Sequence, residues 1–291
     1  MPHLNPAQQL AAQLTPEAIG PMRFRGYTPV ESQLSQVFGG QVMAQCIGAA
    51  EQTLDPGRQL HSLHGYFLRP GSKEIPLDYV VTAIRDGGSF STRQVSAEQE
   101  GKAIFTGMLS FKLPEQGVEH QAATMPEVQS PESRPRDNET LAQFRADNPA
   151  AHVPPPVDWL NALDMRSCGE MPLLRPARRQ PTHGFWFRTR DPMGEAPFHD
   201  HLKILTWVSD IRLITTAMLP HELPYDKSRI RAASLDHAVW VHHPFRVDEW
   251  IYHQMDAPVS GGGRGLNLGR FYNREGLLVA SSSQEGLLRV F

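Results

Sequence analysis

A few polar side chains lie inside apolar sequence, and their type and placement could support chemistry. Asp210 stands in the stretch "WVSDIRLITTAML", between Trp207 and Ile211. An ionised carboxylate in such surroundings is costly unless it has hydrogen-bond partners, and perturbed ionisable groups cluster at functional sites. Asp210 is therefore a candidate general base. His237, which follows Asp236, is a rival candidate, because an imidazole titrates near neutral pH.

Motifs for several other kinds of chemistry are missing from the sequence. There is no G-x-S-x-G motif, which a serine-dependent hydrolase of the α/β type would need. The glycine run from Gly261 to Gly265 lacks the last glycine of a dinucleotide-binding motif, and it predicts a sharp turn or a close approach of two backbones. The thirteen histidines include no H-E-x-x-H pattern. We therefore expect no metal site and no cofactor.

Charge and cysteine content narrow the class of partner and the compartment. Lys and Arg number 28 against 31 Asp and Glu, so the net charge is −3 and there is no basic field of the kind that binds nucleic acid. Cys46 and Cys168 predict neither a disulfide framework nor a zinc ribbon. No signal-peptide pattern, membrane-spanning run or S-K-L ending is found. We expect a cytoplasmic protein of a bacterial cell with a small-molecule partner.

The sequence changes character between Leu113 and Arg179, where proline, glutamate, glutamine and arginine accumulate. Proline fixes its own φ and pushes the preceding residue towards extended conformations, so this stretch cannot be one regular helix or a central strand. It predicts a linker at 116–180 between an N-terminal domain at 1–115 and a C-terminal domain at 181–291.

The two predicted domains look like copies of one another. The segment "YFLRP", ending at Pro70, lies over "WVHHP", ending at Pro244. Further along, "EGKAIFT" from Glu100 matches "EGLLVAS" from Glu275, after the insertion of a single residue in the second copy. The constant order and the near-constant spacing indicate an internal repeat.

Each copy has the same succession of patterns. An apolar run comes first, "VFGGQVMAQCIGAA" in one copy and "HLKILTWVSDIRLITTAML" in the other. The second run has the apolar spacing of a single helix, at Trp207, Ile211, Ile214 and Met218. Strand-like segments follow, with Glu100-Gly101 and Glu275-Gly276 placed as hairpin turns. The pattern predicts an α+β unit in which a long buried helix is wrapped by an antiparallel β-sheet.

Several stretches, taken together and in order, are typical of one family. They are "GGQVMAQ" and "HSLHGYFLRPG" in the first copy, and "WVSDIRLITTAML", "ASLDHAVWVHHPFRVDEW", "SGGGRGLNLGRFYNREG" and "LVASSSQEGLLR" in the second. In these stretches, which extend over nearly the whole chain except the linker, the chain resembles the type II acyl-CoA thioesterase family. The resemblance implies a double hotdog fold, two tandem units that each have a long buried helix wrapped by an antiparallel β-sheet.

The resemblance also implies the site residues. The aspartate, threonine and glutamine of the family's catalytic site fall on Asp210, Ser234 and Gln284. Serine in place of threonine keeps the hydroxyl and loses the methyl group that restricts χ1. The hydroxyl and the carboxamide can orient a water while the aspartate takes its proton. We expect backbone N–H groups near Gly39 and Gly40, at the start of the first helix, to polarise the thioester carbonyl.

These observations predict an enzyme that hydrolyses fatty acyl-CoA, its substrate and partner, to a free fatty acid and CoA through an activated water. Two alternatives stay open: a hotdog enoyl-CoA hydratase, which would use an aspartate and a histidine together, and a non-catalytic acyl-CoA-binding protein. The hydratase pattern D-x-N-x-x-H is missing around Asp210, which is followed by "IRLIT".

Two further expectations concern the pair Asp236-His237 and the assembly. We interpret this pair as a fold-supporting element whose polar groups bond across the two halves, rather than as an acid and a base. Hotdog units close their sheets against one another, so the chain is expected to form a homodimer or a homotetramer.

Overall fold

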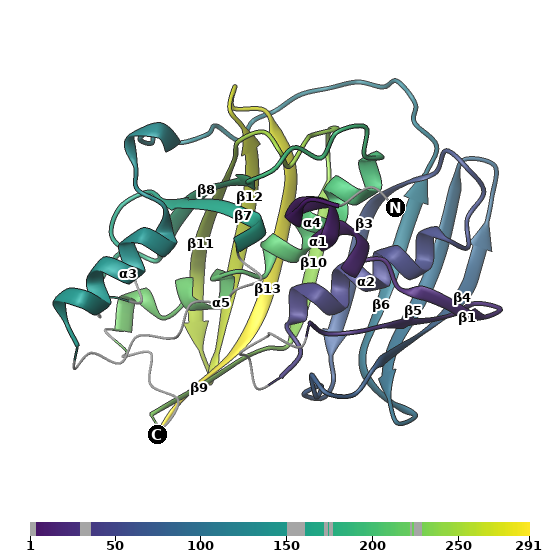
Figure 1. Cartoon of the computed structure of the whole chain (residues 1–291), viewed down its shortest axis with the longest axis horizontal. Coiled ribbons are helices and arrows are strands. Elements are labelled where there is room, and N and C mark those ends of the chain that lie inside the picture. Colours follow the sequence, from purple (N-terminus) through teal and green to yellow (C-terminus); the bar gives the residue numbers. More distant parts are fainter. Residues whose placement is uncertain are drawn as a thin grey trace.

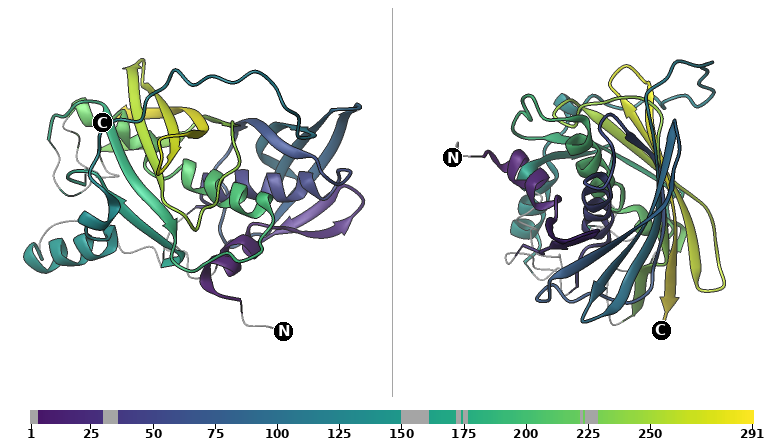
Figure 2. Two further views of the ribbon diagram at one scale, coloured as in Figure 1. Left: turned by 90° about the horizontal axis from the view of Figure 1, so that it is seen from above. Right: turned by 90° about the vertical axis from the view of Figure 1, so that its right-hand side faces the viewer.

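The computed structural model describes residues 4–29, 36–149, 161–171, 174, 177–221, 223 and 229–291. In this part of the chain the strands form one curved antiparallel sheet (Figure 1). The helices α2 (Gly39–Glu51) and α4 (Phe198–Ser209) lie side by side on one face of the sheet (Figure 2). None of the helices described is long and apolar enough to cross a membrane.

The elements follow one another in the same order in two tandem units. The first unit comprises α1 (Pro6–Gln13), β1 (Glu17–Gly20), β2 (Arg23–Gly26), α2, β3 (Gln59–Phe67), β4 (Leu77–Asp86), β5 (Phe90–Gln99) and β6 (Lys102–Lys112). The second comprises α3 (Asp137–Asp147), β7 (Leu163–Ser167), β8 (Thr182–Thr189), α4, α5 (Leu213–Thr216), β9 (Ile230–Ser234), β10 (Asp236–Val241), β11 (Ile251–Gly261), β12 (Arg264–Asn273) and β13 (Leu278–Val290). Short 3₁₀ turns lie at Pro131–Ser133 and Leu219–His221.

The strand order makes the repeat visible in space. It runs β1-β2-β4-β5-β6-β3-β10-β13-β12-β11-β8-β7, with β9 also paired to β13. The second half of this order is the first half reversed, so the units are related by an approximate twofold axis at the β3–β10 seam. At that seam His64 pairs with Ala238, its own counterpart in the alignment that places Pro70 over Pro244.

Both units carry the same irregularity beside the seam. The register of β3 on β6 shifts between Leu60 and Ser62. In the second unit β13 pairs with β10 and then, past Leu235, with β9, where Ser234 lies opposite Gly286. Leu235 is the counterpart of His61, so the register shift lies at the same place in both copies. The shift brings Ser234 to the end of a separate short strand.

The predicted hairpin turns are confirmed. Glu100 and Gly101, between β5 and β6, have φ values of 50° and 72°, the signature of a tight turn with two left-handed residues. Gly276 has φ 85° between β12 and β13. The glycine run makes the sharp turn between β11 and β12, where Gly262 and Gly263 have φ values of 58° and 75°.

The single helix predicted through Met218 is wrong. Helix α4 ends at Ser209, Asp210 is its C-cap, and Arg212 takes the left-handed conformation with φ 64°. The guanidinium of Arg212 lies 2.7 Å from the buried carboxylate of Asp137. At the break between α4 and the short α5, Arg212 thus has a tertiary partner that helical spacing does not reveal.

The range predicted as a linker contains regular structure as well. Helix α3 and strand β7 lie within it, and β7 pairs with β8 as β1 pairs with β2. Residues 121–129 cross the outer face of the second unit, where the Trp186 indole N–H donates to the Gln129 carbonyl at 3.0 Å. The proline-rich stretch "HVPPPVDW" lies outside the described residues. The boundaries at 115 and 180 stay predictions.

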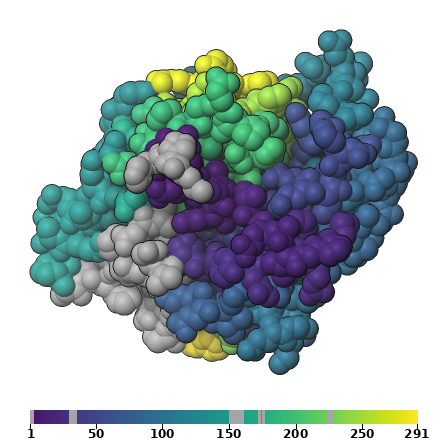
Figure 3. Space-filling model, turned by 45° about the vertical axis from the view of Figure 1, so that its right-hand side comes forward, coloured from purple at the N-terminus to yellow at the C-terminus, as the bar shows by residue number. Residues whose placement is uncertain are grey.

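A buried cation joins the two central helices. Lys203 of α4 is 1% exposed, and its Nζ lies 3.2 Å from Glu51 Oε1 of α2 and 2.9 Å from Asp200 Oδ1. It also donates to the Thr15 hydroxyl of the N-terminal segment, which lies across the surface between the two units (Figure 3). Burial raises the pKa of Glu51, and the charge of Lys203 opposes that rise.

We predict that Lys203→Met lowers the free energy of unfolding by about 3 kcal/mol, because it leaves the mostly buried Glu51 carboxylate unpaired. The double variant Glu51→Gln/Lys203→Met should lose less, since only the partly exposed Asp200 carboxylate is then left without its partner. Urea unfolding followed by circular dichroism measures both. The control is Arg264→Met, which breaks the exposed Arg264–Glu285 pair and should cost less than about 1 kcal/mol. An equal loss of unfolding free energy in Lys203→Met and Arg264→Met would contradict the prediction.

Candidate active site

Three polar side chains meet where α4 ends. Asp210 is 8% exposed. Gln284 of β13 is fully buried, and its Nε2 donates to Asp210 Oδ1 at 2.6 Å. The Ser234 hydroxyl, at the end of β9, accepts from the same Nε2 at 2.9 Å and donates to Asp210 Oδ1 at 3.4 Å. The structure thus brings together the three residues that the resemblance implied.

Asp210 also binds the other unit. The Gly40 N–H of α2 donates to Asp210 Oδ2 at 3.0 Å. The N-cap residue of α2, Phe38, makes no side-chain cap, so the carboxylate of the second unit caps this helix and lies at the positive end of its dipole. The Gly40 N–H, which the sequence suggested for the thioester carbonyl, is therefore bonded to Asp210 in this structure.

The pair Gly39-Gly40 permits this close approach. A Cβ on Gly39 would lie 2.7 Å from Asp210 Oδ2 and 2.9 Å from Cζ of Phe67. A Cβ on Gly40 would overlap the carbonyl oxygen of Trp207. Neither position has room for a side chain. The two glycines of "GGQVMAQ" therefore mark the point where α2 contacts the second unit.

His237 lies directly behind Gln284. Its ring is buried, with Nδ1 3.1 Å from Gln284 Nε2 and Nε2 2.9 Å from the Ser209 hydroxyl oxygen. Burial lowers the pKa of His237 to about 4, so the ring is neutral at neutral pH. Both bonds stay within the second unit, as does the bond from Glu285 N–H to Asp236 Oδ1 at 2.7 Å. The pair does bond across the two halves, as expected, but through its backbone, because Asp236 and His237 of β10 lie opposite Tyr66 and Gly65 of β3. These side-chain bonds, in contrast, stay within the second unit.

Sequence reasoning missed two contributors. Ser209 precedes Asp210 and is not among the predicted site residues, although a hydroxyl beside a buried acid is a recognisable signal. The capping of α2 by Asp210 has no signal in the sequence, because the two residues are 170 positions apart.

In the part of the chain that is described, the first unit has no equivalent cluster. When Pro70 is aligned with Pro244 and Glu100 with Glu275, the counterparts of the serine, the histidine and the glutamine are Leu60, Leu63 and Leu109, all buried. The strand pairing supports this alignment, because Leu63 lies opposite Leu109. The fold therefore accepts leucine at each of these positions.

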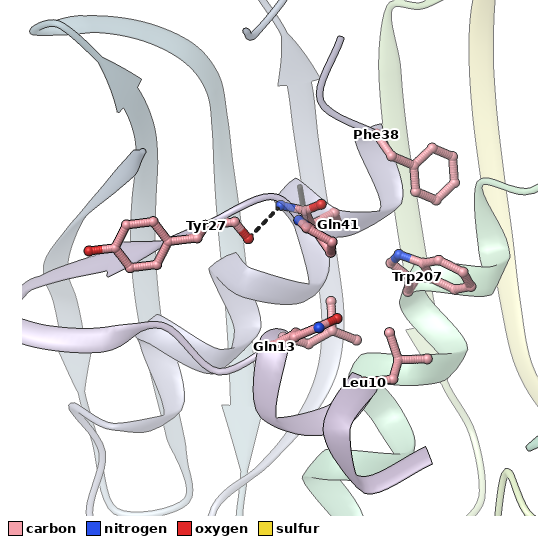
Figure 4. A pocket seen from close by; sticks show the side chains of 8 residues that line it. Leu10, Gln13, Tyr27, Phe38, Gln41 and Trp207 are labelled. Atoms are coloured by element: carbon pink, nitrogen blue, oxygen red, sulfur yellow. Dashed lines mark hydrogen bonds between the residues drawn. The ribbon is translucent and has the colours of Figure 1, made fainter. Parts of the chain in front are cut away.

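A small hollow, open to solvent, lies beside the start of α2 and the end of α4 (Figure 4). Phe38 and Trp207, in edge-to-face contact at 5.6 Å, form its wall nearest to the site. Gln41 bonds the Tyr27 carbonyl across it at 3.2 Å. The remaining lining residues are Leu10, Gln13, Leu14 and Pro29. Among the described residues, no group of three or more His, Cys, Asp or Glu side chains could hold a metal ion.

The fold and the site define a tandem pair of hotdog units with one polar cluster at the meeting point of their helices. The models of the acyl-CoA thioesterase N-terminal and C-terminal domains match residues 28–112 and 131–288. The chain belongs to the acyl-CoA thioesterase family, a family of thioester hydrolases, as the sequence predicted.

Individual relatives agree with this assignment. The chain is 36% identical to acyl-CoA thioesterase 2 of Haemophilus influenzae over 94% of each sequence. The structure of the acyl-CoA thioesterase II TesB2 from Mycobacterium marinum has a TM-score of 0.77 at 34% identity and covers 96% of this chain and 97% of that one. A hot dog fold protein from Alicyclobacillus acidocaldarius has a TM-score of 0.77 at 17% identity, with the same coverage. The predicted double hotdog is confirmed.

We predict that the free energy of unfolding falls as the pH drops below about 6.5. Burial lowers the folded-state pKa of His237 to about 4, that of His183 to about 3, and that of His253 well below the usual range. Between these values and the unfolded value the unfolded chain binds more protons, so stability decreases with falling pH, by up to about 1.4 kcal/mol per pH unit for each histidine. Urea unfolding at pH 7.5, 6 and 5 measures the slope.

A matched pair of variants isolates the histidine contribution. His183→Gln should flatten the slope because one buried ring is removed, whereas His120→Gln, at an exposed position, should leave it unchanged. A slope that is the same in both variants would show that other groups dominate.

Proposed function

We propose that this chain hydrolyses fatty acyl-CoA to a free fatty acid and CoA, with Asp210, Ser234 and Gln284 holding the attacking water. The observation that carries the proposal is the buried Asp210 carboxylate, which receives hydrogen bonds from Gln284, Ser234 and the start of α2. Such a carboxylate is fixed in position, where it can take a proton from a water bound beside it. The printed names of the relatives, acyl-CoA thioesterases, support the same substrate class.

The reaction divides into two steps without a covalent enzyme intermediate. Asp210 takes a proton from water as the water oxygen bonds to the thioester carbon, and the carbonyl becomes an oxyanion. The C–S bond then breaks, and the CoA thiolate takes the proton back from Asp210. Gln284 Oε1 is buried without a partner among the described residues, so it can accept the second water proton. Since Gly40 N–H is engaged, the amide of Gly39 is the donor we assign to the oxyanion.

The geometry favours hydrolysis over the hydratase alternative. A hydratase of this fold would need an imidazole that is free to exchange a proton with substrate. Both ring nitrogens of His237 are engaged, one by Gln284 and one by Ser209. The cluster also favours turnover over mere binding, because a buried carboxylate has no evident use in holding an uncharged thioester.

The compartment and the assembly belong to the same proposal. The bacterial relative supports a cytoplasmic location. A homodimer or homotetramer is supported by the outer face of the sheet beside the seam, where Tyr66 is 61% exposed and Met108 is 41% exposed. Light scattering on the eluting protein tests the assembly, and a monomer at micromolar concentration would exclude it.

We predict that Asp210→Asn lowers turnover of acyl-CoA by at least about a hundredfold, because the proton acceptor is removed while the shape is kept. The loss of stability should stay within about 2 kcal/mol, since the remaining carbonyl oxygen can still cap α2. Release of free CoA thiol and thermal unfolding provide the two measurements. An active and stable Asn variant would mean that Asp210 only caps the helix.

A second prediction concerns the serine that replaces the family's threonine. Ser234→Thr should keep turnover or raise it a few-fold, because the added methyl group removes unproductive χ1 rotamers, an effect of about 0.5–1 kcal/mol. Ser234→Ala removes the hydroxyl and should lower turnover about tenfold or more. The ranking Thr ≥ Ser > Ala, measured with one acyl-CoA, supports the water mechanism. An inactive but folded Thr variant, or a trapped acyl-serine in the mass spectrum, would contradict it.

A further inference from the structure

Gln284 has more hydrogen-bond acceptors around its amide nitrogen than it has protons. Asp210 Oδ1, the Ser234 hydroxyl and His237 Nδ1 lie 2.6, 2.9 and 3.1 Å from Nε2, which carries two hydrogens. Ser234 can direct its own proton to Asp210 Oδ1, so it does not require one from the amide at all times. The amide protons are therefore directed mainly to the carboxylate on one side and to the imidazole on the other.

The tautomer of His237 follows from the bonds behind it. The Ser209 hydroxyl donates its proton to the Thr206 carbonyl at 2.6 Å, so towards His237 it can only accept. The 2.9 Å contact between Ser209 Oγ and His237 Nε2 then requires the proton on Nε2. Nδ1 is left as a bare acceptor, which matches the amide protons of Gln284.

The opposite tautomer of His237, with its proton on Nδ1, would disrupt the contacts of the ring with both Ser209 and Gln284. With its proton on Nδ1, the ring would oppose the amide N–H groups of Gln284. The carboxamide would then turn, and its oxygen would face the Asp210 carboxylate at the 2.6 Å distance that the nitrogen now has. Two acceptors at that distance repel each other, and Asp210 would lose its shortest hydrogen bond.

The fold itself does not require a histidine here. The counterpart of His237 in the first unit is Leu63, which is fully buried at the same place on the sheet, and that of Gln284 is Leu109. A buried imidazole that holds a buried carboxamide is thus a property of the unit that carries the acid. Its presence needs a reason other than packing.

We propose that His237 is a positioning residue of the thioesterase site: as a neutral Nε2–H tautomer fixed by Ser209, it holds the Gln284 carboxamide with its nitrogen towards Asp210 and Ser234. This inference rests on the proposed hydrolysis by these three residues. His237 does not exchange a proton with the substrate. It acts through Gln284, whose oxygen it leaves free on the side away from the carboxylate.

The variants are chosen by which ring nitrogen they imitate. His237→Asn places its side-chain carbonyl near the position of Nδ1 and can still accept from Gln284, whereas His237→Gln reaches only the position of Nε2. His237→Leu installs the residue that the first unit has at this place, so it should fold. We expect turnover to fall about tenfold to a hundredfold in the Leu and Gln variants and less than about fivefold in the Asn variant, with KM within about threefold throughout.

Thiol release from one acyl-CoA, with thermal unfolding as the folding control, measures this series. Rescue by Asn supports positioning, because a merely structural role would favour Leu and a proton-transferring role would tolerate none of the three. Equal activity of the Leu variant and the unchanged chain, or equal loss in Leu and Asn, would overturn the proposal.

A second measurement does not depend on catalysis. In protein labelled with ¹⁵N-histidine, the ring signals that vanish in His237→Leu identify His237, and their ¹⁵N shifts report the tautomer. We expect the Nε2–H form at pH 7, and a shift towards the Nδ1–H form in Ser209→Ala, together with a turnover reduced several-fold. A Nδ1–H ring in the unchanged protein would refute the proposal even if hydrolysis is confirmed. If the chain releases no thiol, the proposed function fails, and the tautomer still tests the geometry.

Discussion

The structure depends on one constraint: a carboxylate buried at the end of a helix must be supplied with hydrogen-bond donors. Asp210 follows the last residue of α4, where the negative end of the helix dipole makes a negative charge least favourable. The donors that offset this cost come from β13, from β9 and from the start of α2. No single unit supplies all of them, so the charged site exists only when the two units are docked.

The same constraint explains why the two copies differ. In the first unit the counterparts on the sheet are leucines, and the capping residue at the end of α2 is Gln52, which is neutral and bonds the Pro16 and Gly48 carbonyls. Without a buried acid, no imidazole or carboxamide is needed beneath the helix. The charge that does lie at that end of the helix pair, Glu51, is compensated by Lys203. One end of the helix pair is therefore an ion pair that joins the units, and the other end is a carboxylate held by neutral donors.

Patterns in the sequence were enough to predict the repeat, the hairpin turns and the family. Turn glycines and alternating strands depend on a few neighbouring residues, and the near-constant spacing of the copies can be found by comparing the sequence with itself. The extent of α4 was not predictable in this way, because the apolar spacing continues past Ser209 while the backbone does not. Beyond the helix end, Arg212 takes the left-handed conformation and pairs with the carboxylate of Asp137, which is distant in the sequence. Helical periodicity carries no information about such a partner.

For the site, too, the sequence predicts which residues take part but not which contacts they make. A resemblance located Asp210, Ser234 and Gln284, and physical reasoning required only that Asp210 have partners. Which partners it has depends on the meeting of α2 with α4, through the close approach that Gly39 and Gly40 permit. Burial lowers the pKa of His237 to about 4, so the ring behind Gln284 is neutral and does not form an ion pair with Asp210. As a neutral acceptor, the ring fixes the orientation of the Gln284 carboxamide, and the carboxamide in turn fixes the Asp210 carboxylate.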